Sequence, residues 1–121
     1  MLPKTISLVD DDEAVRDSMS ALLESYGIAV EAYASPRDFL SHQPLRESDC
    51  ILLDYHMPEM DGLQLLGEIR KQGLSSPAIL ITGKGDSLLN SRALQAGAHA
   101  ILNKPVDDTV LLQSIRSALA A

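Results

Sequence analysis

The sequence predicts a single α/β domain in which a five-stranded parallel sheet carries helices on both faces. Segments with the pattern of strands alternate with segments with the pattern of helices along all 121 residues, as in chains built from βα units. The predicted strands are short, continuous apolar runs, which indicates burial on both faces of a parallel sheet. Connections are short, so we interpret residues 1–121 as one doubly wound domain.

The first half of the chain contains three predicted strands and two predicted helices. The strands are Thr5–Val9, Ile28–Tyr33 and Cys50–Leu53. A helix over Glu13–Tyr26 follows the first strand, and Gly27 ends it. The apolar stripe of this helix consists of Val15, Met19, Leu22, Leu23 and Tyr26. Ser35 and Pro36 predict the N-cap and first position of a short helix that ends at about Ser41.

The second half contains two further strands and three helices. The strands are Ala78–Ile81 and Ala100–Leu102, and the helices are about Gly62–Gln72, Ser87–Ala96 and Asp108–Leu119. Gly73 and Gly97 end the first two of these helices. The apolar residues expected to face inward on the last helix are Leu111, Leu112, Ile115 and Leu119.

Composition excludes several classes of protein. Hydrophobic residues make up 45% of the chain, enough for one core. The net charge of −7 argues against direct binding of nucleic acid, which needs a basic surface. No apolar stretch is long enough for a membrane span, and the N-terminus does not resemble a signal peptide. A single cysteine, Cys50, is expected to be a small core residue, and we expect a cytoplasmic location.

Charged side chains follow three of the predicted strands. The first strand leads into Asp10, Asp11 and Asp12, the third into Asp54 and the fifth, through Asn103, into Lys104. Because the carboxyl ends of parallel strands meet at one edge of the sheet, these side chains should lie close together. Crowded carboxylates repel each other, and a Mg²⁺ ion relieves that repulsion. We expect Asp11 and Asp54 to bind Mg²⁺ directly and Asp10 to bind it through a water molecule.

The same cluster has the parts needed for phosphoryl transfer. An aspartate can attack a phosphoryl group and hold it as an aspartyl phosphate, and Asp54 is the candidate. Lys104 supplies a cation that neutralises charge developing on the phosphoryl oxygens. Thr82, at the end of the fourth strand, can donate its hydroxyl to one of them, and Gly83 lets the backbone approach closely.

This ordered set of residues resembles the receiver domains of bacterial two-component response regulators over the whole chain. The family's acidic pair falls on Asp10 and Asp11, its phosphorylated aspartate on Asp54, and its hydroxyl and lysine on Thr82 and Lys104. The resemblance implies a flavodoxin-like sheet with strand order 2-1-3-4-5. It also implies Mg²⁺ binding, with the backbone carbonyl of the residue two positions after the phosphorylated aspartate, here His56, as a further ligand.

Receivers of this kind imply particular partners. The resemblance points to a sensor histidine kinase or a phosphotransfer protein as the phosphoryl donor, and to catalysis only of the domain's own phosphorylation and dephosphorylation. The segment Ile81–Asp86 looks most like regulators of the nitrogen-fixation type, which usually carry a DNA-binding output domain and regulate transcription. The sequence leaves open whether such a domain follows at the C-terminus, whether the chain forms a homodimer, and which kinase and signal it serves.

The chain departs from the family at two positions. Ile101 stands where the family usually has Phe or Tyr, and Val106 stands where Phe is common. We therefore expect phosphorylation to rearrange Thr82 locally and to move the surface around Ile101 less than in relatives with an aromatic residue. His56 and Lys84 occupy the positions that border the path of attacking water, so we expect them to tune the lifetime of the phosphoryl group.

Four alternatives compete with this interpretation. The run Asp10–Asp12 could serve only to cap a helix. A phosphatase of the haloacid dehalogenase type needs a second aspartate at the position of His56. A flavin-binding module needs a phosphate-binding loop after the first strand, where the acidic run would repel phosphate. A degenerate receiver that acts as an interaction module without phosphorylation stays open because of Ile101.

Overall fold

The computed structural model describes residues 4–42, 48–83 and 85–120. Its five strands form one parallel sheet in the order β2-β1-β3-β4-β5. The strands are β1 (Thr5–Val9), β2 (Ala29–Tyr33), β3 (Cys50–Asp54), β4 (Ala78–Thr82) and β5 (Ala100–Asn103). This is the flavodoxin-like order that the family resemblance implied, so the predicted fold class is confirmed.

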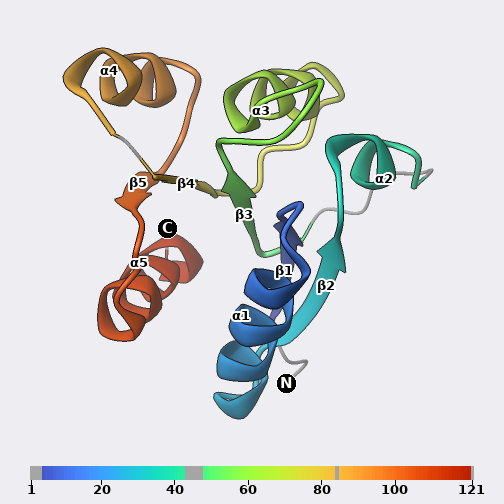
Figure 1. Cartoon of the computed structure of the whole chain (residues 1–121), viewed down its shortest axis with the longest axis vertical. Coiled ribbons are helices and arrows are strands. Elements are labelled where there is room, and N and C mark those ends of the chain that lie inside the picture. The colour runs from blue at the N-terminus through green and yellow to red at the C-terminus, as the bar shows by residue number, and fades with distance from the viewer. Residues whose placement is uncertain (1–3, 43–47, 84, 121) are drawn as a thin grey trace.

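Helices cover both faces of the sheet. They are α1 (Glu13–Ser25), α2 (Pro36–Leu40), α3 (Gly62–Lys71), α4 (Ser87–Gln95) and α5 (Asp108–Ala120). Figure 1 shows α1 and α5 together on one side of the sheet and α2, α3 and α4 on the other. In the described part of the chain, no helix combines the length and apolar character needed to cross a membrane.

Two apolar layers hold the helices to the sheet. The layer under α1 and α5 has Ile6, Leu8, Leu23, Cys50, Leu52, Ile79, Ile81, Leu102, Leu111, Leu112, Ile115 and Ala118. The opposite layer has Val9, Phe39, Ile51, Leu53, Met57, Leu65, Leu66, Ile69, Ala78, Leu80, Leu89, Ala93 and Ala98. Burial raises the pKa of the Cys50 thiol to about 12, as befits a core residue rather than a reactive one.

Burial on both faces holds for the central strands but not for β2. Every residue of β3 and β4 is buried, whereas the residues of β2 are exposed or half-buried. The sequence pattern was misleading here because β2 is an edge strand that pairs with β1 alone. Tyr26 is also wrong as a core residue: it is 55% exposed because it leaves the helix as the C-cap of α1.

Element boundaries differ from the predictions by one or two residues. Strands β3, β4 and β5 each include one polar residue beyond the apolar run, namely Asp54, Thr82 and Asn103. Ladder hydrogen bonds continue through these residues regardless of their polarity, as Lys104 N shows by donating to Thr82 O at 2.8 Å. The side chains at the carboxyl edge are therefore held by the sheet itself.

Helices that begin at this edge are capped by polar side chains. Asp12, Ser35, Asp61 and Asp86 accept hydrogen bonds from backbone amides in the first turns of α1, α2, α3 and α4 respectively. Each cap satisfies amides that have no partner within the helix. These caps fix where each loop at the carboxyl edge ends and where its helix begins.

Candidate functional site

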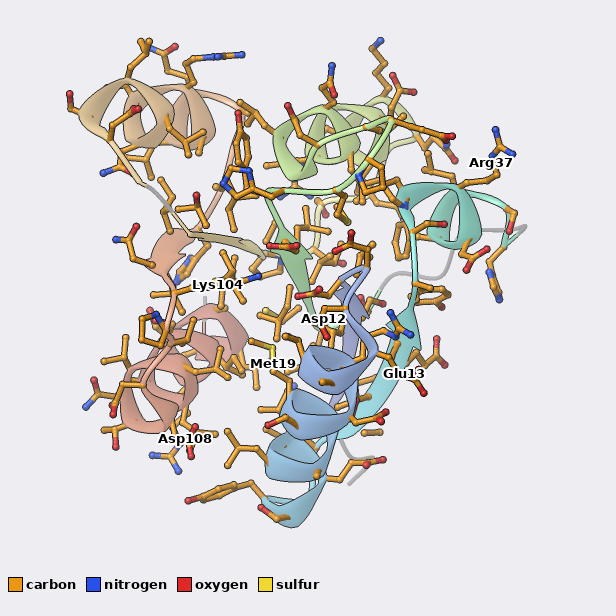
Figure 2. The ribbon with its side chains drawn as sticks, viewed as in Figure 1. Asp12, Glu13, Met19, Arg37, Lys104 and Asp108 are labelled. Carbon is orange, nitrogen blue, oxygen red and sulfur yellow. The ribbon has the colours of Figure 1, made fainter. Side chains whose placement is uncertain are left out.

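Acidic and basic side chains meet at the carboxyl edge of the sheet. Lys104 follows β5, and its Nζ lies 3.0 Å from Asp54 Oδ1 and 3.9 Å from Asp10 Oδ2. Figure 2 shows the Lys104 side chain reaching away from the β5 end toward the centre of the sheet. Three strands that are distant in the sequence thus bring their terminal charges together, as the sequence predicted.

Three carboxylates of this cluster are arranged to hold a cation. Asp10, Asp11 and Asp54 each offer an oxygen, and these oxygens lie within 4.8 Å of one another. Asp10 and Asp54 are buried, whereas Asp11 is exposed. Carboxylate oxygens at this spacing suit a hard divalent cation that keeps part of its water shell, with Asp11 on the open side.

Burial and neighbouring negative charges disfavour the ionised form of Asp10. Burial raises the pKa of Asp10, and the charges of Asp54 and Asp11 raise it further, although the amide of Asp12 and the ammonium of Lys104 act in the opposite sense. Burial disfavours the charge of Lys104, but the neighbouring carboxylates outweigh burial and raise its pKa. Among the described residues, the ammonium of Lys104 faces three carboxylates, which leaves room for further positive charge.

One oxygen of the central aspartate lacks an ordinary hydrogen bond. Asp54 Oδ1 is buried, and no group in the described part of the chain donates to it with good hydrogen-bond geometry. Lys104 Nζ forms an ion pair with this oxygen at 3.0 Å. A buried carboxylate oxygen whose described partner is this ion pair can accept a further one, such as a metal cation.

The residues of the acidic run Asp10–Asp12 have two different roles. Asp12 caps α1, accepting from Ala14 N at 2.9 Å and Val15 N at 3.3 Å. Asp10 accepts from Asp12 N through Oδ1 at 2.9 Å, which fixes its carboxylate at the site. The capping alternative is thus correct for Asp12 and insufficient for Asp10 and Asp11.

Arg16 was not singled out from the sequence. Its Nη1 donates to the backbone carbonyl of Asp10 at 2.8 Å. This contact ties the start of α1 to the end of β1 and so holds the backbone that carries the two acidic residues. No spacing rule would have found it, because the contact is between a long side chain and a backbone atom across a turn.

The loop after Asp54 is packed tightly against the site. A Cβ atom on Gly62 would lie 2.4 Å from the backbone oxygen of Asp54 and 2.8 Å from a methyl group of Leu80, so only glycine fits there. Within the loop, Glu59 has the left-handed φ of 71° and Met60 N donates to Pro58 O at 2.8 Å. This tight γ-turn sets the path of the chain from β3 into α3.

Thr82 and His56 lie next to each other at the end of β4. Thr82 is fully buried, and its Oγ1 is 3.5 Å from Nε2 of the exposed His56 ring. That ring packs edge-on against Tyr55, with ring centroids 4.8 Å apart. The predicted role of the His56 carbonyl as a metal ligand stays a prediction, and Lys84 lies outside the described residues.

Ile101 occupies a half-buried position in β5. It pairs with Leu80 of β4 and packs against the apolar layer under α2, α3 and α4. Tyr55 packs against the same layer. The chain therefore has an aliphatic residue, with less area to bury, at the position where the family usually has Phe or Tyr.

Comparison with known proteins gives a consistent result. A model of the response regulator receiver domain matches residues 6–116. The chain is 39% identical over 114 residues to the transcriptional regulatory protein FixJ of Azorhizobium caulinodans, covering 94% of this chain and 54% of that protein. It is 40% identical over 119 residues to the C4-dicarboxylate transport transcriptional regulatory protein DctR of Rhodobacter capsulatus, covering 97% of this chain and 60% of that protein. The chain thus spans little more than half the length of these relatives.

Solved structures with the same fold agree with this result. The crystal structure of FixJ-N superposes with a TM-score of 0.89 at 35% identity, covering 99% of this chain and 96% of the other. A CheY-like receiver domain protein from Methanospirillum hungatei superposes with a TM-score of 0.91 at 33% identity, covering 98% of this chain and 95% of the other. Both similarities extend over the complete sheet and its helices.

Proposed function

This chain belongs to the response regulator receiver domain family, and we propose that it accepts a phosphoryl group on Asp54 in a magnesium-dependent reaction. The observation that carries the proposal is the position of Asp54. Its buried carboxylate lies 3.0 Å from Lys104 Nζ and shares its surroundings with the carboxylates of Asp10 and Asp11. A nucleophile, a cation and a metal-binding set are thus combined in one place.

The proposed transfer requires little covalent chemistry from the protein. An oxygen of Asp54 attacks the phosphorus of a phosphohistidine, a P–O bond forms, and the P–N bond breaks. The released imidazole nitrogen keeps the electron pair and takes a proton from solvent. Lys104 and the Thr82 hydroxyl would then contact phosphoryl oxygens and offset their charge. Later attack by water on phosphorus releases inorganic phosphate and restores the carboxylate, so the domain would act only on its own phosphoryl group.

Mg²⁺ is the cofactor that these residues fit best. Asp10, Asp11 and Asp54 would hold it, with Asp11 on the solvent side. When bound, the ion would supply positive charge beside the phosphoryl oxygens. The raised pKa of Asp10 supports this assignment, because burial and the neighbouring carboxylates disfavour its charged form.

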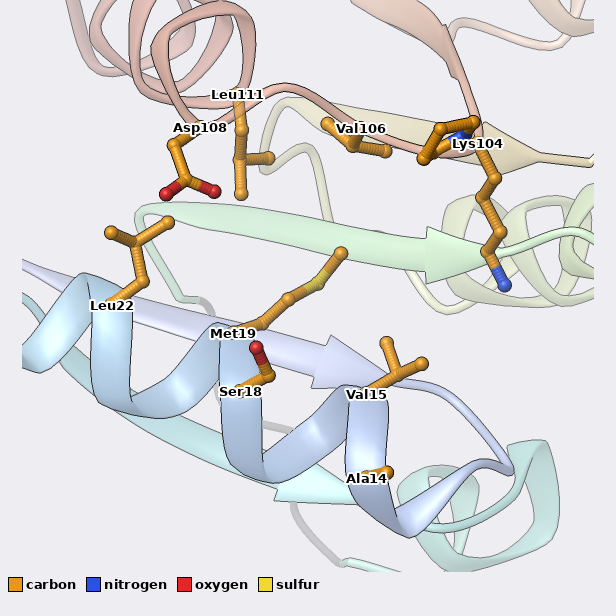
Figure 3. Close-up of a pocket in the computed structure, with 10 residues that line it drawn as sticks. Ala14, Val15, Ser18, Met19, Leu22, Lys104, Val106, Asp108 and Leu111 are labelled. Carbon is orange, nitrogen blue, oxygen red and sulfur yellow. The ribbon is translucent and has the colours of Figure 1, made fainter.

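The phosphoryl donor would be a sensor histidine kinase or a phosphotransfer protein. An apolar groove between α1 and the start of α5 ends beside Lys104, as Figure 3 shows. Its floor includes Val15 and Met19 of α1 and Val106 and Leu111 from the other side. A helix that carries a phosphohistidine could lay its apolar face in this groove and bring the phosphoryl group to the site.

The output would lie outside this chain. FixJ and DctR are transcriptional regulators, and this chain covers 54% and 60% of them. We infer that phosphorylation here switches an attached or separate output element in transcription regulation, in the cytoplasm. Direct contact with nucleic acid would fall to that element, because the net charge of this chain is −7.

Phosphorylation by a small-molecule donor tests the proposal. The protein is incubated with acetyl phosphate and Mg²⁺, and the added mass is measured on the intact protein. One acid-stable, base-labile phosphoryl group is expected, and Asp54→Asn should abolish it. The control is Asp49→Asn, since Asp49 lies at the opposite end of β3 and accepts from Thr5 N. No labelling of the parent, or equal labelling of Asp54→Asn, would favour the degenerate receiver.

A further inference from the structure

Asn103 ends β5 and Lys104 follows it, and both are hydrogen-bonded to residues at or just after the end of β4. Lys104 N donates to Thr82 O at 2.8 Å. The side chain of Asn103 accepts from Gly85 N through Oδ1 at 3.1 Å. The first of these contacts continues the parallel ladder, whereas the second depends on one particular side chain.

The Asn103 contact leaves no space at Gly85. A Cβ atom there would lie 2.4 Å from Asn103 Oδ1 and 3.3 Å from Asn103 Cγ. The close approach of the Asn103 carboxamide is therefore sufficient reason that a side chain does not fit at this position. The Gly85 amide and the Asn103 carboxamide thus lie too close together for a side chain at position 85.

The segment held in this way connects the site to α4. Thr82 is at its start, and Asp86, directly after Gly85, caps α4 by accepting from Leu89 N at 2.7 Å. Gly83 and Gly85 give this segment more conformational freedom than other residues would. The hydrogen bond from Gly85 to Asn103 therefore limits where Gly85 and the cap of α4 lie.

We propose that Asn103 is a positioning residue for phosphorylation of Asp54. By holding the Gly85 amide at the end of β5, it fixes the position of Gly85 relative to Thr82 and Lys104, which would contact a phosphoryl group on Asp54. This inference rests on the proposed function of Asp54. Lys104 is fixed by the same strand end, so one short stretch of β5 positions both the cation and the segment opposite it.

A double-mutant cycle tests this inference. The variants are Asn103→Ala, Gly85→Ala and the double variant, each compared with the parent in the initial rate of labelling by acetyl phosphate with saturating Mg²⁺. A single exposed hydrogen bond is modest in strength, so Asn103→Ala should slow labelling about fivefold. Gly85→Ala should slow it similarly, because its methyl group displaces the Asn103 side chain. The double variant should be no slower than Asn103→Ala, since the clash is then absent.

Two further measurements separate positioning from general damage. Asn90→Ala, at an exposed site on α4, should label at the parent rate. Hydrogen exchange at the Gly85 amide should quicken in Asn103→Ala while exchange in β3 and β4 stays unchanged. Labelling of Asn103→Ala at the parent rate or faster, or additive losses in the double variant, would overturn the inference. An unlabelled parent would instead overturn the proposed function on which it rests.

Discussion

Removal of the positive charge of Lys104 should destabilise the folded protein when no Mg²⁺ is present. The ammonium nitrogen lies 3.0 Å from Asp54 Oδ1 and 3.9 Å from Asp10 Oδ2. Lys104→Met keeps most of the aliphatic stem and removes the charge. Three carboxylates, including that of Asp11, would then share the edge of the sheet without the cation that the structure describes beside them.

The expected size follows from these two distances. Coulomb's law gives about 10 kcal/mol for the two attractions together at an effective dielectric constant of about 20, and about 2.5 kcal/mol in bulk water. The Lys104 side chain is 34% exposed, so solvent screening favours the lower value. Burial also disfavours the ammonium in the folded protein, which subtracts from the gain. We therefore expect the free energy of unfolding to fall by about 2 kcal/mol.

Urea unfolding followed by circular dichroism measures this change. At pH 7 in EDTA the midpoint for Lys104→Met should be lower than that of the parent. Added Mg²⁺ should stabilise the variant, because an ion bound only in the folded state raises the free energy of unfolding. The pKa of Lys104 is raised above its ordinary 10.5 in the folded protein. The parent's advantage should accordingly persist from neutral pH to 10.5 and disappear as the pH rises through the higher folded value.

A matched control separates this effect from the loss of any surface lysine. Lys71 is 75% exposed and pairs with Glu68 at 3.4 Å on the outside of α3. Lys71→Met should change the free energy of unfolding by less than about 0.5 kcal/mol. If Lys104→Met in EDTA were as stable as the parent, the charge balance described for Asp10 and Asp54 would be refuted.

Three further predictions concern neighbouring residues. Asp11→Ala should remove Mg²⁺ binding, measured by titration of backbone amide signals, while the fold persists; unchanged affinity would contradict its role as a ligand. Gly62→Ala should lower the free energy of unfolding by about 2 kcal/mol, because its Cβ would lie 2.4 Å from Asp54 O; a parent-like urea midpoint would disprove the packing argument. His56→Ala should shorten the lifetime of the phosphoryl group about threefold without moving it, because the ring beside Thr82 screens the site from water; equal decay rates would count against this.

The main residues of the site could be predicted because the topology of a parallel sheet determines their meeting place. Asp10, Asp54 and Lys104 are each encoded next to an apolar run, and all such runs end at the same edge. The contacts of Arg16 and Asn103 could not be predicted. Each joins a side chain to a backbone atom across elements, and neither periodicity nor spacing encodes such a contact.

The burial of the edge strand shows a second limit of the sequence. The apolar character of β2 indicates that it is a strand, but its burial depends on which strands flank it and which helices cover it. Tyr26 shows the same limit at a helix end. Its place in the apolar periodicity of α1 is correct, yet the chain leaves the helix there and the ring becomes exposed. Local pattern thus predicts the element more reliably than its surroundings.

Ile101 raises the question of how the proposed phosphorylation would affect α4 without the aromatic residue that the family usually has at this position. Ile101 is half-buried against an apolar layer, and a rotamer change there would bury little additional area. The Asn103–Gly85 hydrogen bond offers another route, because Gly85 immediately precedes the residue that caps α4. A displacement of Asn103 at the end of β5 would then reach the start of the helix through this hydrogen bond. With a beryllofluoride phosphate mimic, backbone chemical shifts should change more at Gly85 and Leu89 than at Ile101, and the reverse order would show that the aliphatic side chain itself is the switch.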